Sequence, residues 1–227
     1  MSLSDIIDSI ESNKDRLKSV INKQLGDIPE NKRIYQKELE EKQKKQSLLP
    51  SYFKNWLDKI PKSDKVLDLG CGFGFSTKFL LDSGKFQAVV GVDDDPIMIK
   101  KAKELYNYEH FYYDSSYTKL TFKDNNFDAI FSYDSLRNQK NIAQTLGEVR
   151  RILKNNGTLI LIVLLYSVVK DLHLYSWMPQ TKEEIISVVE KSGFKIEESE
   201  QINTLEKLGL MLTQSNNTVV YIKAIKK

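Results

Sequence analysis

Two carboxylates flank a run of closely spaced glycines. Asp68 ends a short apolar stretch, Gly70, Gly72 and Gly74 follow at alternate positions, and Asp93 ends the next apolar stretch. Alternate glycines let the backbone adopt positive φ and let a ligand approach main-chain N–H groups closely. A carboxylate roughly 20 residues beyond such glycines is where doubly wound folds hold a ribose by its hydroxyls. The pattern therefore indicates a ligand that carries adenosine.

The glycine spacing argues against a dinucleotide. The NAD fingerprint needs a third glycine three residues after the second, but Phe75 or Thr77 stands there in the two registers. Asp68 precedes the turn, where a carboxylate would repel a pyrophosphate and attract an ammonium group, directly or through water. An adenosine with an amino acid attached satisfies both ends of the pattern.

Two motifs in register resemble those of a known family. The segment 68–74 resembles the first motif of the class I S-adenosylmethionine-dependent methyltransferases, and 91–96 resembles the second. The resemblance extends from about Lys65 to the C-terminus. It implies S-adenosylmethionine as cofactor, S-adenosylhomocysteine as product, and no metal. The chain looks most like the small-molecule branch that includes quinone-biosynthesis-type methyltransferases.

The resemblance also implies roles for single residues. Asp93 is expected at the ribose, Asp68 near the methionine ammonium, and Asp114 at the adenine amine. The expected cofactor-binding residues are Asp68, Gly70, Cys71, Gly72, Gly74, Asp93, Asp94, Asp114, Ser115 and Ser132. Helix capping by Asp94 and Asp95, and turn formation by Asp114, are the structural alternatives.

The acceptor side has no decisive motif. Methyl transfer from a sulfonium is an in-line displacement that depends on alignment and needs no catalytic triad. His173 and Tyr133 are the candidates for accepting a proton from a hydroxyl or amine acceptor. His110 and Cys71 are expected to be structural. Because the only cysteine lies in the glycine turn, cytosine C5 methylation, which needs a cysteine nucleophile, is excluded.

The sequence is compatible with three functions. The first is methyl transfer to a small molecule, and the second is a non-catalytic S-adenosylmethionine-binding or partner-regulating protein on the same fold. The third is aminopropyl transfer from the decarboxylated cofactor, against which Asp68 argues mildly because it is placed near an amino acid terminus.

Composition indicates a globular protein of balanced charge. The 227 residues include 34 Lys and Arg against 31 Asp and Glu, a net charge of +3 that provides no strong field for nucleic acid. A single cysteine allows no disulfide within the chain and suggests a reducing, cytoplasmic location. Asp5 and Asp8 interrupt the apolar core that an export signal needs. The longest apolar run, 159–169, is too short to span a bilayer. The oligomeric state stays open.

Alternating strand and helix patterns from residue 66 onward predict a doubly wound α/β sheet with helices on both faces. Expected strands are 66–69, 88–92, 111–113, 129–132, 158–164, 195–202 and 218–225, and expected helices are 76–81, 97–106, 142–153 and one that begins at the capping box of Thr181 and Glu184. The resemblance implies seven strands, mostly parallel, with the antiparallel last strand inserted into the sheet. Periodicity before residue 60 indicates helices. We therefore expect a helical cap over 1–60 and a methyltransferase domain over 61–227.

Overall fold

The computed structural model describes residues 55–56, 58–136, 139–166, 179, 181–203 and 217–227. The chain divides into two compact units, 1–59 and 60–227, and most of the described residues lie in the second unit. The helical cap predicted before residue 60 lies almost entirely outside the described residues, so its helices stay predictions.

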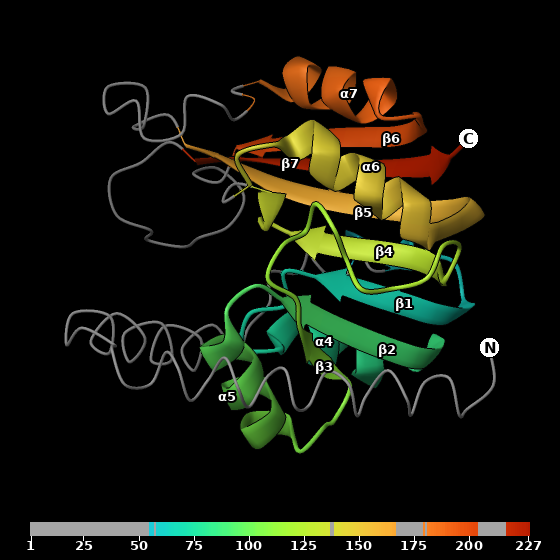
Figure 1. Cartoon of the computed structure of the whole chain (residues 1–227). Helices are drawn as coiled ribbons and strands as arrows, with labels where there is room; N and C mark the ends of the chain where they lie inside the picture. The colour runs from blue at the N-terminus through green and yellow to red at the C-terminus, as the bar shows by residue number, and fades with distance from the viewer. Residues whose placement is uncertain (1–54, 57, 137–138, 167–178, 180, 204–216) are drawn as a thin grey trace. The chain divides into compact units, whose positions relative to one another are not determined.

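A seven-stranded sheet with the order β3-β2-β1-β4-β5-β7-β6 forms the centre of this unit (Figure 1). The strands are β1 Ser63–Leu69, β2 Phe86–Asp93, β3 Phe111–Tyr113, β4 Phe127–Tyr133, β5 Leu153–Tyr166, β6 Phe194–Asn203 and β7 Asn217–Lys226. The pairs among β1 to β5 are all parallel, whereas β7 is antiparallel to both β5 and β6. The insertion of an antiparallel last strand is therefore confirmed.

Four described helices cover the two faces of the sheet: α4 Phe75–Asp82, α5 Pro96–Tyr106, α6 Ile142–Ile152 and α7 Lys182–Lys191. Side chains of α6 and α7 meet Val163 of β5, while Thr77 of α4 contacts Asp68 of β1. The strand register places Asp68 and Val163 on opposite faces, because side chains alternate along each strand. In Figure 1, α6 lies in front of the sheet and α4 lies behind it. The doubly wound arrangement is confirmed.

Local signals in the sequence set the helix starts. The Asp95 carboxylate accepts a hydrogen bond from Ile97 N at 2.8 Å, and Pro96 occupies the first helical position of α5. Thr181 Oγ1 accepts from Glu184 N at 3.1 Å at the start of α7, as the capping box predicts. Of the two aspartates expected as caps, Asp95 is the cap of α5. The Asp94 carboxylate instead accepts a hydrogen bond from Gln139 Nε2.

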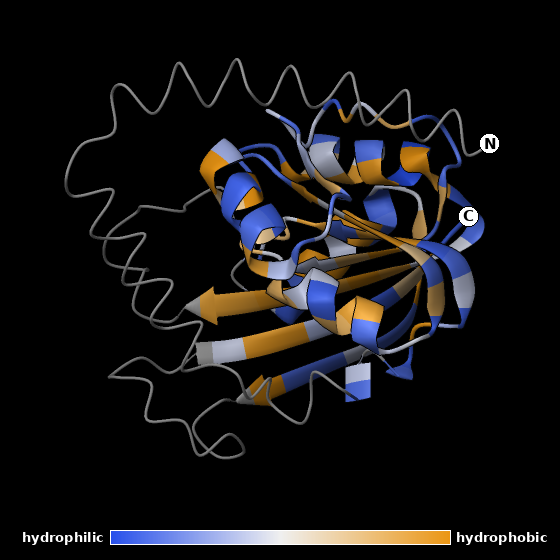
Figure 2. Cartoon of the chain, turned by 90° about the horizontal axis from the view of Figure 1, so that it is seen from below, coloured by the Kyte–Doolittle hydropathy of each residue, from blue (hydrophilic) through white to orange (hydrophobic). Residues whose placement is uncertain are grey.

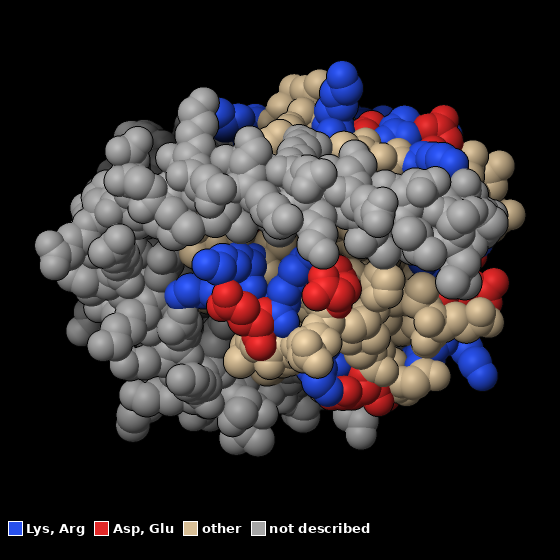
Figure 3. Space-filling model, turned by 60° about the horizontal axis from the view of Figure 1, so that its bottom comes forward, with Lys and Arg blue, Asp and Glu red and all other residues tan. Residues whose placement is uncertain are grey.

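The core lies between the sheet and its helices. Apolar side chains of β1, β4, β5 and β7 are buried, and Figure 2 shows these strands as mainly hydrophobic and the helices as two-sided. Among the described residues, no helix is both long enough and apolar enough to cross a membrane. Charged residues of both signs lie side by side on the face that Figure 3 shows.

The start of β5 differs from the prediction. A turn was expected between Lys154 and Gly157, but β5 begins at Leu153, directly after α6. Its pairing with β4 moves from Phe127–Leu153 to Ala129–Thr158, so the intervening residues form a bulge in which Asn156 has a φ of 60°. A bulge and a turn have similar sequence signals, since both need residues that tolerate positive φ.

Candidate cofactor site

Strand register brings Asp68 and Asp93 to one face of the sheet. Asp68 of β1 pairs with Gly91 of β2, and Asp93 follows Gly91 by two residues. Partners in neighbouring parallel strands share a face and side chains repeat with a period of two, so the two carboxylates lie on the same side. Tyr113 of β3 pairs with Asp93 and shares this face. We therefore expect a ligand at the carboxyl edge of the sheet to contact both acids, and we call the space that it would occupy the cofactor hollow.

The glycine turn lies between these acids. Gly70 N and Cys71 N both donate to Val92 O, at 2.8 and 3.0 Å, which attaches the turn to the end of β2. Gly70, at φ 77°, has no room for a side chain, because an added Cβ would lie 2.2 Å from Ser135 Cβ. Gly72 has a φ of 52°, and a Cβ there would meet no atom of the described residues within 4 Å. The turn thus leaves open space beside Gly72, where a ligand could approach the backbone.

Asp68 is a buried carboxylate with one oxygen occupied and one unpaired. Its Oδ2 accepts hydrogen bonds from the hydroxyls of Ser76 and Thr77, both at 2.6 Å, at the start of α4. No donor in the described part of the chain reaches its Oδ1, although the residue is fully buried. Burial raises the pKa of Asp68 to about 6, and hydrogen bonds from the Ser76 and Thr77 hydroxyls and from the Thr77 backbone oppose that shift. An unpaired buried carboxylate oxygen is costly unless a ligand supplies a donor.

Each carboxylate oxygen of Asp93 accepts a hydrogen bond from a different segment of the backbone. Its Oδ2 accepts from Gly72 N at 2.8 Å, and its Oδ1 accepts from Asp95 N at 2.9 Å. Burial raises the pKa of Asp93 to about 7, the two backbone bonds lower it, and the neighbouring acids raise it slightly. Asp93 therefore couples the glycine turn to the segment that starts α5.

Asp114 closes the loop that follows β3. Its Oδ2 accepts from the backbone and the hydroxyl of Thr121, at 2.8 and 3.0 Å, and Asp114 N donates to Asp93 O at 3.0 Å. The carboxylate is buried, whereas the neighbouring Ser115 is exposed. The turn-forming alternative for Asp114 is therefore realised, and its contact with adenine stays a prediction.

The other predicted cofactor residues lie around the same turn. Ser132 is buried at the end of β4, and its hydroxyl contacts that of Ser135. Gln139 Nε2 donates to Asp94 Oδ2 at 3.3 Å. The thiol of Cys71 is buried, and burial followed by the charges of Asp93 and Asp68 raises its pKa well above the usual range. A thiol in that state is a poor nucleophile, which agrees with a structural role.

The catalytic candidates are placed differently. Tyr133 is half-buried at the end of β4, and the register with β1 puts it on the same face as Asp68. His173 lies outside the described residues. His110 precedes β3, and its Nδ1 lies 3.4 Å from the hydroxyl of Tyr112, as a structural residue would.

Tyr117 was not predicted from the sequence. It lies in the loop after β3, only 2% of its surface is exposed, and its hydroxyl oxygen accepts from Asp94 N at 3.3 Å. Burial, followed by the charges of Asp93 and Asp94, raises the pKa of this hydroxyl well above its usual range. A lone aromatic residue among Ser, Thr and Lys is the sequence signal that marks it.

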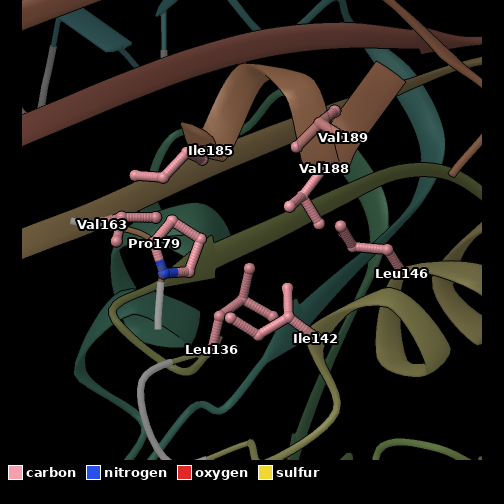
Figure 4. A pocket seen from close by; sticks show the side chains of 8 residues that line it. All are labelled: Leu136, Ile142, Leu146, Val163, Pro179, Ile185, Val188 and Val189. Atoms are coloured by element: carbon pink, nitrogen blue, oxygen red, sulfur yellow. The ribbon is translucent and has the colours of Figure 1, made fainter. Parts of the chain in front are cut away.

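An apolar pocket lies on the opposite face of the sheet. Figure 4 shows side chains that converge from α6, α7 and β5, and its lining residues are Leu136, Ile142, Leu146, Val163, Pro179, Ile185, Val188 and Val189. None of these belongs to the glycine turn or to the end of β2. The pocket is therefore separate from the hollow between Asp68 and Asp93.

The residues present fit an adenosyl amino acid. The unpaired Oδ1 of Asp68 matches an ammonium donor, and the open space at Gly72 allows close approach to the backbone. Each Asp93 oxygen accepts one backbone hydrogen bond and keeps a further lone pair for a ribose hydroxyl.

Comparison with known proteins agrees with this geometry. The family model described as "Methyltransferase domain" matches residues 67–161. This range contains the glycine turn, Asp93 and Asp114. Residues 67–161 therefore match a methyltransferase domain, and this match agrees with the resemblance of the two motifs to the class I S-adenosylmethionine-dependent methyltransferases.

Relatives include enzymes named for quinone substrates. Demethylmenaquinone methyltransferase of Tropheryma whipplei is 33% identical over 102 residues, which cover 44% of this chain and 42% of that protein. The 2-methyl-6-phytyl-1,4-hydroquinone methyltransferase of Synechocystis sp. is 32% identical over 107 residues, covering 46% of this chain and 33% of that protein. The chain thus spans less than half the length of each of these two relatives.

Solved structures share the fold. An S-adenosylmethionine-dependent methyltransferase of Methanosarcina mazei superposes with a TM-score of 0.60 at 19% identity, covering 78% of this chain and 98% of that chain. Similarity at this level of identity supports the architecture of the sheet and its helices.

Proposed function

We propose that the protein transfers a methyl group from S-adenosylmethionine to a small-molecule acceptor by in-line displacement. The observation that carries this proposal is the buried Asp68, whose Oδ1 has no donor among the described residues. Asp68 shares its face of the sheet with Asp93, and the glycine turn lies between them.

Each acid has a separate part in binding. Asp68 Oδ1 takes the ammonium of the amino acid end, while Ser76 and Thr77 hold Oδ2 and fix the carboxylate in place. Asp93 accepts the ribose hydroxyls. The hydrogen bond from Gly72 N to Asp93 fixes the Asp93 carboxylate relative to the glycine turn.

The positions of the acids suit sulfonium chemistry. The bound cofactor supplies an electrophilic methyl group and a neutral thioether as leaving group. A carboxylate against the sulfur would stabilise the charged ground state more than the transition state and would slow transfer. Asp68 and Asp93 act at the periphery of the ligand, so that their binding energy aligns the reactants without opposing the loss of charge.

Tyr133 is the catalytic candidate that lies among the described residues. Tyr133 lies at the end of β4 on the face of Asp68, where its hydroxyl could contact an acceptor and take part in removing a proton. The two quinone-named relatives and the mixed surface charge support a small molecule over nucleic acid.

Binding and turnover test the proposal in sequence. We expect calorimetry to detect binding of S-adenosylhomocysteine, and Asp68→Asn to weaken it by about ten- to a hundredfold, because a charge-assisted hydrogen bond is lost. Asp82→Asn is the matched control, since Asp82 is an exposed carboxylate at the other end of α4. Wild-type protein that shows no binding would refute the cofactor assignment.

Turnover separates the enzyme from the alternative. Incubation with S-adenosylmethionine and a panel of phenols, quinols, amines and carboxylic acids should yield S-adenosylhomocysteine with at least one class. Tight binding without product over the whole panel would favour a non-catalytic S-adenosylmethionine-binding protein. Tighter binding of the decarboxylated cofactor would favour aminopropyl transfer.

A further inference from the structure

The loop between β3 and β4 carries one buried aromatic side chain, Tyr117, next to the end of β2. A turn at its tip is closed by Lys119 N, which donates to Ser116 O at 3.4 Å, and by a 2.7 Å contact between the hydroxyls of Ser116 and Thr118. Tyr117 occupies the second position of this turn. Its side chain is 2% exposed, although Ser115 and Lys119 on either side are exposed.

Two sets of hydrogen bonds hold the base of this loop. In the first, Asp114 accepts two hydrogen bonds from Thr121. The second comes from α6: Glu148 Oε1 accepts from Leu120 N at 2.7 Å, and Arg151 Nη2 donates to Leu120 O at 3.0 Å. A loop held at its base and its tip gives Tyr117 a defined position with little entropy left to lose on ligand binding.

The Tyr117 hydroxyl contacts Asp94, the residue directly after Asp93, which is the acid assigned to the ribose. It accepts a hydrogen bond from Asp94 N at 3.3 Å. The neighbouring Asp93 binds Gly72 N through one oxygen and Asp95 N through the other. The peptide between Asp93 and Asp94 is thus held by the Tyr117 hydroxyl and by Asp114 N, while Gly72 N of the glycine turn holds the Asp93 carboxylate.

We infer that Tyr117 is a positioning residue for cofactor recognition, which holds the Asp93–Asp94 peptide so that the Asp93 carboxylate faces the ribose hydroxyls. The inference rests on the proposed function for its ligand. It assigns specificity for the ribose to a loop outside the two motifs that mark the site in the sequence. The phenol acts through Asp94 and Asp93 and does not contact the reacting atoms.

Tyr117→Phe tests the inference because it keeps the ring and removes only the hydroxyl. We expect the affinity for S-adenosylhomocysteine to fall by about three- to tenfold, the effect of losing one hydrogen bond. Tyr112→Phe is the matched control. Tyr112 is also a buried tyrosine, but the register puts it on the other face from Asp93.

A second ligand distinguishes positioning from a general structural effect. Wild-type protein should bind S-adenosylhomocysteine more tightly than its 2′-deoxyribose analogue, and this ratio should shrink in Tyr117→Phe because the ribose contact is loosened. Equal weakening of both ligands, or no weakening at all, would overturn the inference.

Amide hydrogen exchange tests the same link without ligand. In Tyr117→Phe, exchange at the Asp94 amide should become faster, while Tyr112→Phe should leave it as in wild type. Unchanged exchange at Asp94 would refute the positioning role. Absence of S-adenosylhomocysteine binding by the wild type would instead refute the proposed function, so the two failures are distinguishable.

Discussion

At the scale of single residues, burial and hydrogen bonding act in opposite directions on the two acids of the hollow. Burial raises their pKa values from 3.8 to about 6 for Asp68 and about 7 for Asp93, while the hydroxyl and backbone donors lower them. Between pH about 4 and 7 the folded protein therefore binds more protons than the unfolded chain. The contribution of these acids to the free energy of unfolding falls as the pH rises through this window.

Ligand binding should reverse this protonation. An ammonium at Asp68 favours the ionised carboxylate, so binding below the pKa of about 6 must release a proton. We expect the affinity for S-adenosylhomocysteine to rise by up to about tenfold per pH unit between pH about 5 and 6 and to level off above about 7. Calorimetry at pH 6 in two buffers of different ionisation enthalpy measures the released proton. Asp68→Asn should remove most of the release, and a pH-independent affinity would contradict the assignment.

At the scale of elements, the glycine turn contains positions with different requirements. Both Gly70 and Gly72 have positive φ, but a side chain at Gly70 would overlap Ser135 whereas one at Gly72 would enter open space. The first glycine is thus required by the packing of β1 against the segment after β4. The second is available for a ligand.

This difference predicts opposite phenotypes. Gly70→Ala should lower the free energy of unfolding by about 2–4 kcal/mol, from a left-handed alanine and overpacking together. Gly72→Ala should cost about 1 kcal/mol but should weaken S-adenosylhomocysteine binding by about tenfold or more, because a methyl group fills the open space. Urea denaturation and calorimetry on the two variants check both statements. Equal free energies of unfolding for the two variants would show that the contact with Ser135 does not destabilise Gly70→Ala.

Helix α6 offers a stabilising change away from the site. Gly147 is exposed in the middle of this helix, and a Cβ there would meet nothing within 4 Å. Gly147→Ala should raise the free energy of unfolding by about 0.5–1 kcal/mol, since glycine has a lower helix propensity than alanine. Denaturant titration measures the gain, and cofactor affinity should stay at the wild-type value. A loss of stability would mean that the helix needs flexibility at this position.

At the scale of the whole molecule, the last strand connects distant segments at the end of the sheet where the parallel strands begin. The candidate cofactor site lies at the other end. Lys226 of β7 is buried, and its Nζ donates to Leu153 O at 2.6 Å and to Asn125 Oδ1 at 2.8 Å. Leu153 is the junction between α6 and β5, next to the bulge. A single side chain thus satisfies the backbone where the strand pairing is irregular.

Removing this amine should destabilise the fold without affecting the hollow. Lys226→Met should lower the free energy of unfolding by about 1–3 kcal/mol, because it leaves the buried Leu153 O without this donor. Lys223→Met is the control: Lys223 pairs with the more exposed Glu197 at 2.9 Å, and its loss should cost about 0–1 kcal/mol. Equal effects of the two substitutions in urea denaturation would refute the structural role of Lys226.

Local sequence determined the elements and the chemical class of the site. Strand and helix periods, the caps at Asp95 and Thr181, and the glycine turn with Asp68 and Asp93 depend on residues near one another in the chain, so they can be read without coordinates. Cofactor contacts by Asp114, Ser115 and Ser132, and the roles of Tyr133 and His173, stay predictions.

Only the tertiary structure decided how these parts meet. That Asp68 and Asp93 share a face depends on the register between β1 and β2, and a shift of one residue would reverse it. The unpaired Asp68 oxygen, the contact of Tyr117 with Asp94 and the bulge in β5 depend on loops and helices that approach from elsewhere in the chain. Periodic burial encodes the elements locally, whereas the satisfaction of a buried polar atom is a property of the assembled fold.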